Sequence, residues 1–120
     1  MLMLTYWKNV DLKEYDIAYY ATHSVPVPCR RPGVIHRPDL GPSLSLADAY
    51  YTGRVNAETF YSMYEDELRN TKMDKLRELV AESDSGKWIQ VLFFEKLPTD
   101  GERPYMYKVL KELTQEVNIE

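Results

Sequence analysis

A basic segment between Ile17 and Pro38 holds the residues of this sequence that are best suited to binding an anion. It contains no acidic residue and carries three arginines, both histidines and the only cysteine: Arg30, Arg31, Arg37, His23, His36 and Cys29. The chain has a formal net charge of −4 and this segment contributes +3, so the remainder carries −7. Guanidinium groups match phosphate and carboxylate groups bidentately. The segment is compatible with two interpretations: a solvated basic loop that its prolines hold in shape, or an anion site after a strand.

A second candidate site follows the most apolar stretch of the chain, residues 88–94. Glu95 comes directly after that stretch, and Arg103 stands before a proline of the kind that opens a helix. Amide groups at a helix start attract anions, and Arg103 would add further donors, unless it forms an ordinary ion pair with Asp100 or Glu102. Glu95 could act as a general base, accept a hydrogen bond from a ribose hydroxyl, or pair with an arginine of the basic segment.

Among the remaining reactive residues, His23 joins Glu95 as a catalytic candidate. His23 could act as a general acid or base, or bond to the backbone at the end of a strand. Cys29 lies beside two arginines, but no base is fixed next to it, so a small apolar packing role is favoured over a nucleophile. The spacing of His23, Cys29 and His36 is not that of a metal site, and the glycines form no phosphate-binding loop. We expect neither a metal nor a cofactor.

Strands that alternate with helices must position these residues. Runs of apolar and aromatic residues predict strands. Apolar residues at helical spacing predict helices, and Ser45 and Asn56 are predicted to cap the first two of them. The strands are expected at residues 2–8, 17–22, 88–94 and 117–119, and the helices at 45–52, 56–68, 74–82 and from 104 onward. Five of the seven prolines lie in residues 24–43, which predicts a long irregular loop. The pattern indicates an α/β fold of two or three layers, Rossmann-like, with a mostly parallel sheet.

Length and composition restrict the class of protein. The 120 residues suffice for one domain, 1–120, and their 15 aromatic residues oppose disorder. A single cysteine indicates a reduced, cytoplasmic setting, and no apolar run reaches the length of a membrane span. The net charge opposes general nucleic-acid binding, although one basic loop could contact a few phosphates.

The order of several motifs resembles that of a known family. Leu40-Gly-Pro-Ser43 precedes a short helix with Ala49-Tyr50 and Gly53-Arg54-Val55, and then come Phe60, Tyr64 and Leu68 at spacings of four. With Phe94-Glu95-Lys96 and a final helix, residues 6–113 are similar to the bacterial and phage proteins of domain-of-unknown-function family 488. The resemblance implies a compact Rossmann-like α/β fold and no particular reaction.

The chain departs from the family at one motif. Members typically carry a Cys-His-Arg triplet at the start of the last helix, where this sequence has Gly101-Glu102-Arg103. Only the arginine carries over, so any chemistry of the Cys and His is not expected here, whereas anion binding by Arg103 remains an expectation.

Two functions are compatible with these observations. In the first, a phosphorylated or nucleotide-like ligand binds where two loops meet at the carboxyl edge of the sheet. The ligand-binding residues would be Ser24, Arg30, Arg31, Arg37, Ser43, Glu95 and Arg103. In the alternative, the protein is a non-enzymatic phage or bacterial factor that binds a host protein through tyrosines such as Tyr50, Tyr51 and Tyr61. The residues fix no reaction.

Overall fold

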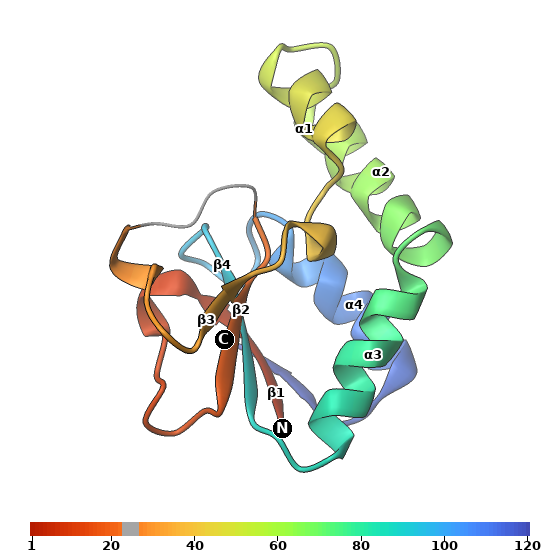
Figure 1. Cartoon of the computed structure of the whole chain (residues 1–120). Coiled ribbons are helices and arrows are strands. Elements are labelled where there is room, and N and C mark those ends of the chain that lie inside the picture. The colour runs from red at the N-terminus through yellow and green to blue at the C-terminus, as the bar shows by residue number, and fades with distance from the viewer. Residues whose placement is uncertain (23–26) are drawn as a thin grey trace.

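The computed structural model describes residues 1–22 and 27–120 and contains one five-stranded sheet (Figure 1). The strands are β1 (Leu2–Tyr6), β2 (Ile17–Tyr20), β3 (Val34–His36), β4 (Ile89–Phe93) and β5 (Val117–Ile119). Their order is β3-β2-β4-β1-β5, and every neighbouring pair is parallel. The predicted α/β class with a parallel sheet is therefore confirmed, and the most apolar predicted strand, β4, is buried along its whole length at the centre.

The described part of the chain has four α-helices. They are α1 (Leu44–Tyr51), α2 (Ala57–Asn70), α3 (Met73–Asp84) and α4 (Arg103–Leu113). In Figure 1, α3 and α4 cover one face of the sheet, while α1 and the start of α2 stand beyond the carboxyl ends of the strands. The arrangement has two layers, a Rossmann-like sheet and a single layer of helices.

The alternation of side chains along the strands divides the core into two clusters. The larger cluster joins the sheet to the helices, with Leu4, Val91 and Phe93 from the strands packed with Leu76 of α3 and Leu110 of α4. The smaller one lies on the opposite face, where Ala18, Tyr20, Cys29 and Leu92 are buried. Because successive strand residues point to opposite faces, both faces of β4 contribute to burial.

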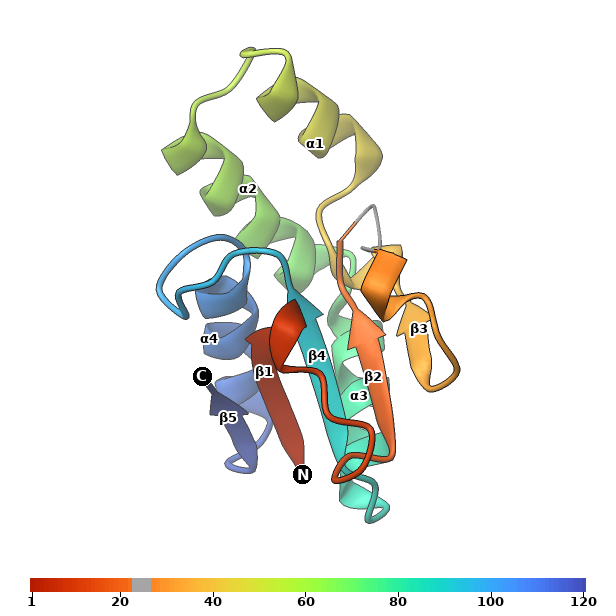
Figure 2. The same cartoon turned by 90° about the vertical axis from the view of Figure 1, so that its left-hand side faces the viewer.

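Within the described part of the chain, short segments cover the face of the sheet without α-helices (Figure 2). The 3₁₀ helix η1 (Trp7–Asn9) and the turn after it cross this face. Gln90 of β4 fixes them there, since its side chain accepts from the Asp11 amide at 2.8 Å and donates to the Asn9 carbonyl at 3.1 Å. Because both the oxygen and the nitrogen of this side-chain amide have hydrogen-bond partners, a polar residue can be buried in the central strand.

The proline-rich segment contains a strand that the sequence pattern does not indicate. β3 has only three residues, pairs with β2 alone, and lies at the edge of the sheet between two prolines. An edge position is where flanking prolines are tolerated, because one side of the strand needs no ladder hydrogen bonds. The predicted residues His23 and Ser24 lie outside the described part of the chain.

The helix caps agree with the sequence at α2 and differ at α1. Asn56 accepts from the Thr59 amide at 2.8 Å, as predicted. The prediction of Ser45 as the first cap is wrong: Ser43 caps α1 by accepting from the Leu46 amide at 3.2 Å. Ser43 has the extended backbone that a cap requires, and its hydroxyl also donates to Glu67 of α2 at 2.5 Å.

Candidate functional site

A cavity of about 200 Å³ opens at the carboxyl ends of β2 and β4. Thr22 follows β2, and Phe94 and Glu95 follow β4, while Glu102 precedes α4. The helical side is formed by Pro42, Ala47, Tyr51 and Phe60. Ligands of open α/β sheets bind outside the carboxyl ends of strands, so the cavity has the usual position for a site. We call it the acid–aromatic cavity.

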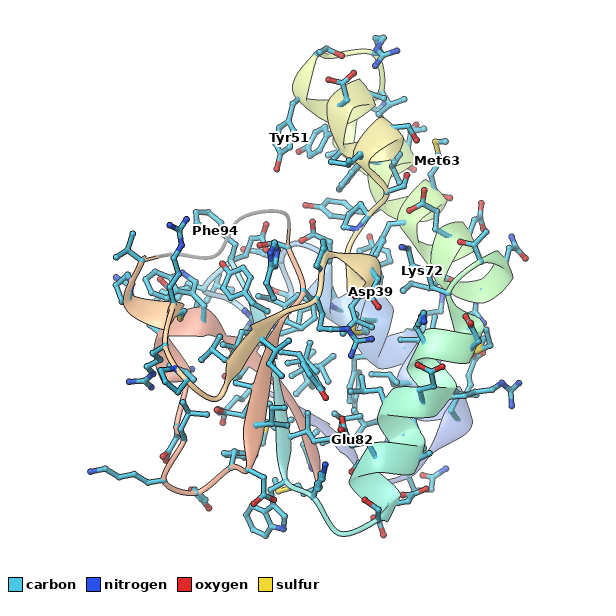
Figure 3. All side chains as sticks on the ribbon, in the orientation of Figure 1. Asp39, Tyr51, Met63, Lys72, Glu82 and Phe94 are labelled. Atoms are coloured by element: carbon cyan, nitrogen blue, oxygen red, sulfur yellow. The ribbon has the colours of Figure 1, made fainter. Side chains whose placement is uncertain are left out.

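Two exposed aromatic rings stand at this cavity. Tyr51 is 82% exposed and Phe94 is 63% exposed, more than any other aromatic residue in the described part of the chain. Figure 3 shows Tyr51 on α1 and Phe94 beyond β4 on two sides of the space above the sheet. Large exposed apolar side chains that share one hollow are typical of binding surfaces.

The polar part of the cavity is a pair of carboxyl groups, Glu95 and Glu102. Burial, together with the charge of the nearby Glu95, raises the pKa of the Glu102 carboxyl group to about 7. One oxygen of each, Oε2, is enclosed and has no hydrogen-bond partner among the described residues. A pair of this kind shares a proton near neutral pH and can both donate and accept.

Gly101 allows the two carboxyl groups to come together. It has a φ of +70°, and a Cβ atom at this position would lie 2.1 Å from Glu95 Oε2. A left-handed backbone and the absence of a side chain are therefore both needed for Glu95 to fold over the turn toward Glu102.

Arg103 holds the backbone beneath the cavity and does not line it. Its side chain is fully buried, and it donates to the carbonyl of Glu120 at 2.5 Å and to the carbonyl of Glu95. The guanidinium also lies 5.8 Å from the centre of the Phe93 ring. Burial lowers the pKa of Arg103, an effect that the nearby Glu95 opposes. Arg103 thus joins the end of β4 to the end of β5.

The two predicted loops meet at the same edge of the sheet, but the arginines that were expected to line their junction lie elsewhere. Arg37 pairs with Asp39 at 2.8 Å and lies over the Tyr19 ring. Arg31 lines a separate hollow, with Cys29, on the face without helices. Arg30 is exposed in the same segment. The walls of the cavity are consequently acidic and aromatic.

The remaining candidates have structural partners. His36 Nε2 contacts the Thr22 carbonyl, and Ser43 caps α1. The Cys29 thiol is buried and lies 3.7 Å from the Trp7 carbonyl, and this burial raises its pKa, although Arg31 acts in the opposite direction. A raised pKa is the opposite of what a nucleophilic thiol needs.

The predicted tyrosine surface is only partly exposed. Tyr50 stacks on Phe60 with ring centres 4.4 Å apart, and Tyr61 stacks on Tyr105 at 5.2 Å. Both tyrosines are half-buried, whereas Tyr51 is exposed at the cavity.

Several cavity residues are not among the predicted ligand-binding residues, although Tyr51 was named for the alternative function of protein binding. Tyr51, Phe94 and Glu102 come from three separate segments, and their encounter depends on the path of α1 above the sheet. The only signal in the sequence was the proximity of Glu102 to Glu95 across a short loop.

Nowhere in residues 1–22 and 27–120 do three His, Cys, Asp or Glu side chains group as for a metal ion. In the same ranges, no helix is long and apolar enough to cross a membrane.

Comparison with known proteins agrees with the resemblance seen in the motifs. The sequence model described as "Domain of unknown function DUF488" matches residues 30–112, which is more than half of the chain. No curated protein and no solved structure matches. The match includes β3, all of α1 to α3, β4 and the cavity residues from Pro42 to Glu102. By this match the chain belongs to the DUF488 family of proteins.

Proposed function

We propose that the protein binds a small nucleotide-like ligand in the acid–aromatic cavity, with a nucleoside as the part that enters it. The observation that carries this proposal is the placement of two exposed rings, Tyr51 and Phe94, beside the carboxyl pair Glu95–Glu102. A planar base can stack on aromatic rings, and sugar hydroxyls can donate to and accept from carboxyl groups. The ligand class therefore combines a flat ring with vicinal hydroxyls.

The energetic cost of the carboxyl pair supports a functional role. Bringing two carboxyl groups together raises the pKa of Glu102 to about 7 and leaves two enclosed oxygens without partners among the described residues. Strongly perturbed pKa values of this kind concentrate at functional sites. A half-protonated pair provides one donor and several acceptors, which suits the two hydroxyls of a ribose.

The size of the cavity limits the ligand. Ligand pockets usually measure roughly 300–1,000 Å³, and this cavity of about 200 Å³ is smaller. It accommodates one ring with its substituents, and the remainder of a nucleoside would lie against the rings at the opening. A phosphate group would be repelled by Glu95 and Glu102, so we place any phosphate outside the cavity, toward the basic segment.

Calorimetry with a panel of nucleosides and their mono-, di- and cyclic nucleotides tests the proposal. We expect at least one nucleoside to bind and to lose about tenfold in affinity in Tyr51→Ala, because one stacked ring contributes roughly 1–3 kcal/mol. Leu44→Ala is the matched control, since Leu44 is an exposed apolar residue of the same helix and does not line the cavity.

The carboxyl group is tested in the same assay. Glu102→Gln should weaken binding and remove its dependence on pH around 7, whereas Glu116→Gln, at an exposed glutamate outside the cavity, should change neither. Absence of heat with every nucleoside and nucleotide at low salt would contradict the proposed function.

A further inference from the structure

A groove lies on the face of the sheet without helices, away from the acid–aromatic cavity. Two adjoining hollows of about 440 and 520 Å³ share Val10 and Arg31. Both hollows are lined by residues of η1 or of the turn that follows it. In Figure 1, the segment that follows β1 lies on the side of the sheet opposite α3 and α4. We call this surface the basic groove. Among the residues that the structure describes, it shares no lining residue with the acid–aromatic cavity.

The charges at the basic groove are predominantly positive and are not neutralised. Lys8, Lys13 and Arg31 line it, and none of them has a carboxylate within salt-bridge distance among the described residues. Asp11 is the single acid in its lining, and its Oδ1 accepts from the amides of Lys13 and Glu14. In a chain of net charge −4, three unpaired cations around one hollow attract an anionic partner.

The floor between these charges is apolar. Val10 and Leu12 are half-buried and pack on the small core cluster of this face, and Pro28 lines the hollow beside them. The neighbouring Val27 is 72% exposed. A partner that fits must therefore bring both apolar groups and negative charge.

We propose that the basic groove binds an acidic peptide segment of a partner protein, one in which Glu or Asp alternates with aliphatic residues. Lys8, Lys13 and Arg31 would pair with the carboxylates, and Val10 and Leu12 would contact the aliphatic side chains. In an extended peptide, successive side chains point in opposite directions, so acidic and aliphatic side chains can contact the charged and the apolar parts of the groove.

The composition of the groove favours a peptide over single-stranded nucleic acid. Surfaces for single strands present several aromatic rings for stacking. Among the described residues, Trp7 is the one aromatic ring in the lining, and Lys8 already lies 5.4 Å from its centre. A long polyanion would also meet the acidic remainder of the protein, whereas a short peptide interacts mainly within a Debye length of about 8–10 Å.

Tryptophan fluorescence provides the test. In a Trp88→Phe background, Trp7 is the remaining tryptophan of the chain and it lines the groove. The probe is a capped, non-aromatic peptide of alternating Glu and Leu, about eight residues long. We expect a saturable change in Trp7 emission that weakens as salt is added, and no change with the corresponding Lys-Leu peptide.

Charge-reversal variants locate the interaction. Lys8→Glu combined with Arg31→Glu should weaken binding of the Glu-Leu peptide about tenfold or more, because two attractions become repulsions. Arg77→Glu, at an exposed arginine of α3 on the other side of the sheet, should leave the affinity unchanged. No saturable binding of the Glu-Leu peptide, an unchanged affinity in the double variant, or tighter binding of oligothymidylate would each overturn the proposal.

Discussion

The acid–aromatic cavity and the basic groove are opposite in charge although both border the proline-rich segment. The cavity collects two glutamates and two exposed rings at the carboxyl ends of β2 and β4. The groove collects Lys8, Lys13 and Arg31 on the face without helices. Among the described residues, the arginines of the basic segment do not line the cavity, because Arg37 pairs with Asp39 and Arg31 lies at the groove.

The two regions also differ in how their charges are held. In the cavity, Glu95 and Glu102 each have an enclosed carboxyl oxygen, and the buried Arg103 donates to the backbone carbonyl of Glu95. In the groove, Lys8, Lys13 and Arg31 are exposed and form no ion pair with any described residue. Substitutions near the cavity should therefore change stability strongly, and substitutions at the groove should change binding with little effect on stability.

The largest effect is expected for Arg103→Met. The substitution leaves the carbonyls of Glu95 and Glu120 without their donor in a buried site, which should lower the free energy of unfolding by about 3–5 kcal/mol. Urea denaturation measures this change, with Arg77→Met as the exposed control, expected within about 0.5 kcal/mol of wild type. A loss below about 1 kcal/mol at Arg103 would show that the buried arginine does not support the cavity.

The next effect is a pH dependence of stability that comes from Glu102. Its pKa rises from 4.5 in the unfolded chain to about 7 in the folded protein, so the folded state binds the proton more tightly. Stability from this group is complete below about pH 4.5 and is lost as the pH rises through 7, a total of about 3 kcal/mol.

Glu102→Gln should remove this dependence, because glutamine does not titrate. We expect the variant to be more stable than wild type at pH 8 and to have no such advantage at pH 4.5, as measured by urea unfolding at both values. Parallel stability curves for the two proteins across this range would contradict the raised pKa of Glu102.

A smaller effect is expected for Gly101→Ala. Its positive φ disfavours alanine by about 1–2 kcal/mol, and the new Cβ would also displace the Glu95 side chain. Gly53→Ala is the control, since Gly53 has a φ of +77° and open space around its Cβ position. Only Gly101→Ala should also bring the pKa of Glu102 back toward its ordinary range, which NMR titration of the side-chain carboxyl measures. Equal pKa values in both variants would show that Gly101 does not position the pair.

The smallest effect on stability belongs to the groove. Lys8→Glu and Arg31→Glu remove no ion pair of the described residues, so each should change the free energy of unfolding by less than about 0.5 kcal/mol. Thermal or urea unfolding checks this value. A loss comparable to that of Arg103→Met would mean that the groove cations support the fold, and the contrast between the two regions would not hold.

Much of the fold could be predicted from the sequence because its signals are local. The apolar run at 88–94 is the central strand, Asn56 caps α2, and the proline after Arg103 opens α4. β3 was missed because three residues between prolines carry no periodic pattern. The α1 cap was placed two residues late because Ser43 and Ser45 have the same side chain, and the contact of Ser43 with Glu67 is long-range.

Two of the expected segments come together, but the arginines that were expected to line their junction do not line the cavity. The residues directly after β2 and β4 line the same cavity, and Glu95 is one of them. The direction of each arginine depends on tertiary contacts, such as the two backbone carbonyls that receive Arg103 and the Asp39 carboxylate that pairs with Arg37. Hydrogen bonds and ion pairs of this kind, whether between distant residues or within one turn, leave no recognisable pattern in a single sequence.

The central claim is that the acid–aromatic cavity takes a nucleoside, and amide chemical-shift mapping during titration with the nucleoside panel tests it most directly. The account predicts that shifts for at least one nucleoside are largest at Tyr51, Phe94, Glu95 and Glu102. Shifts confined to Lys8, Lys13 and Arg31, or no shifts with any nucleoside, would contradict it.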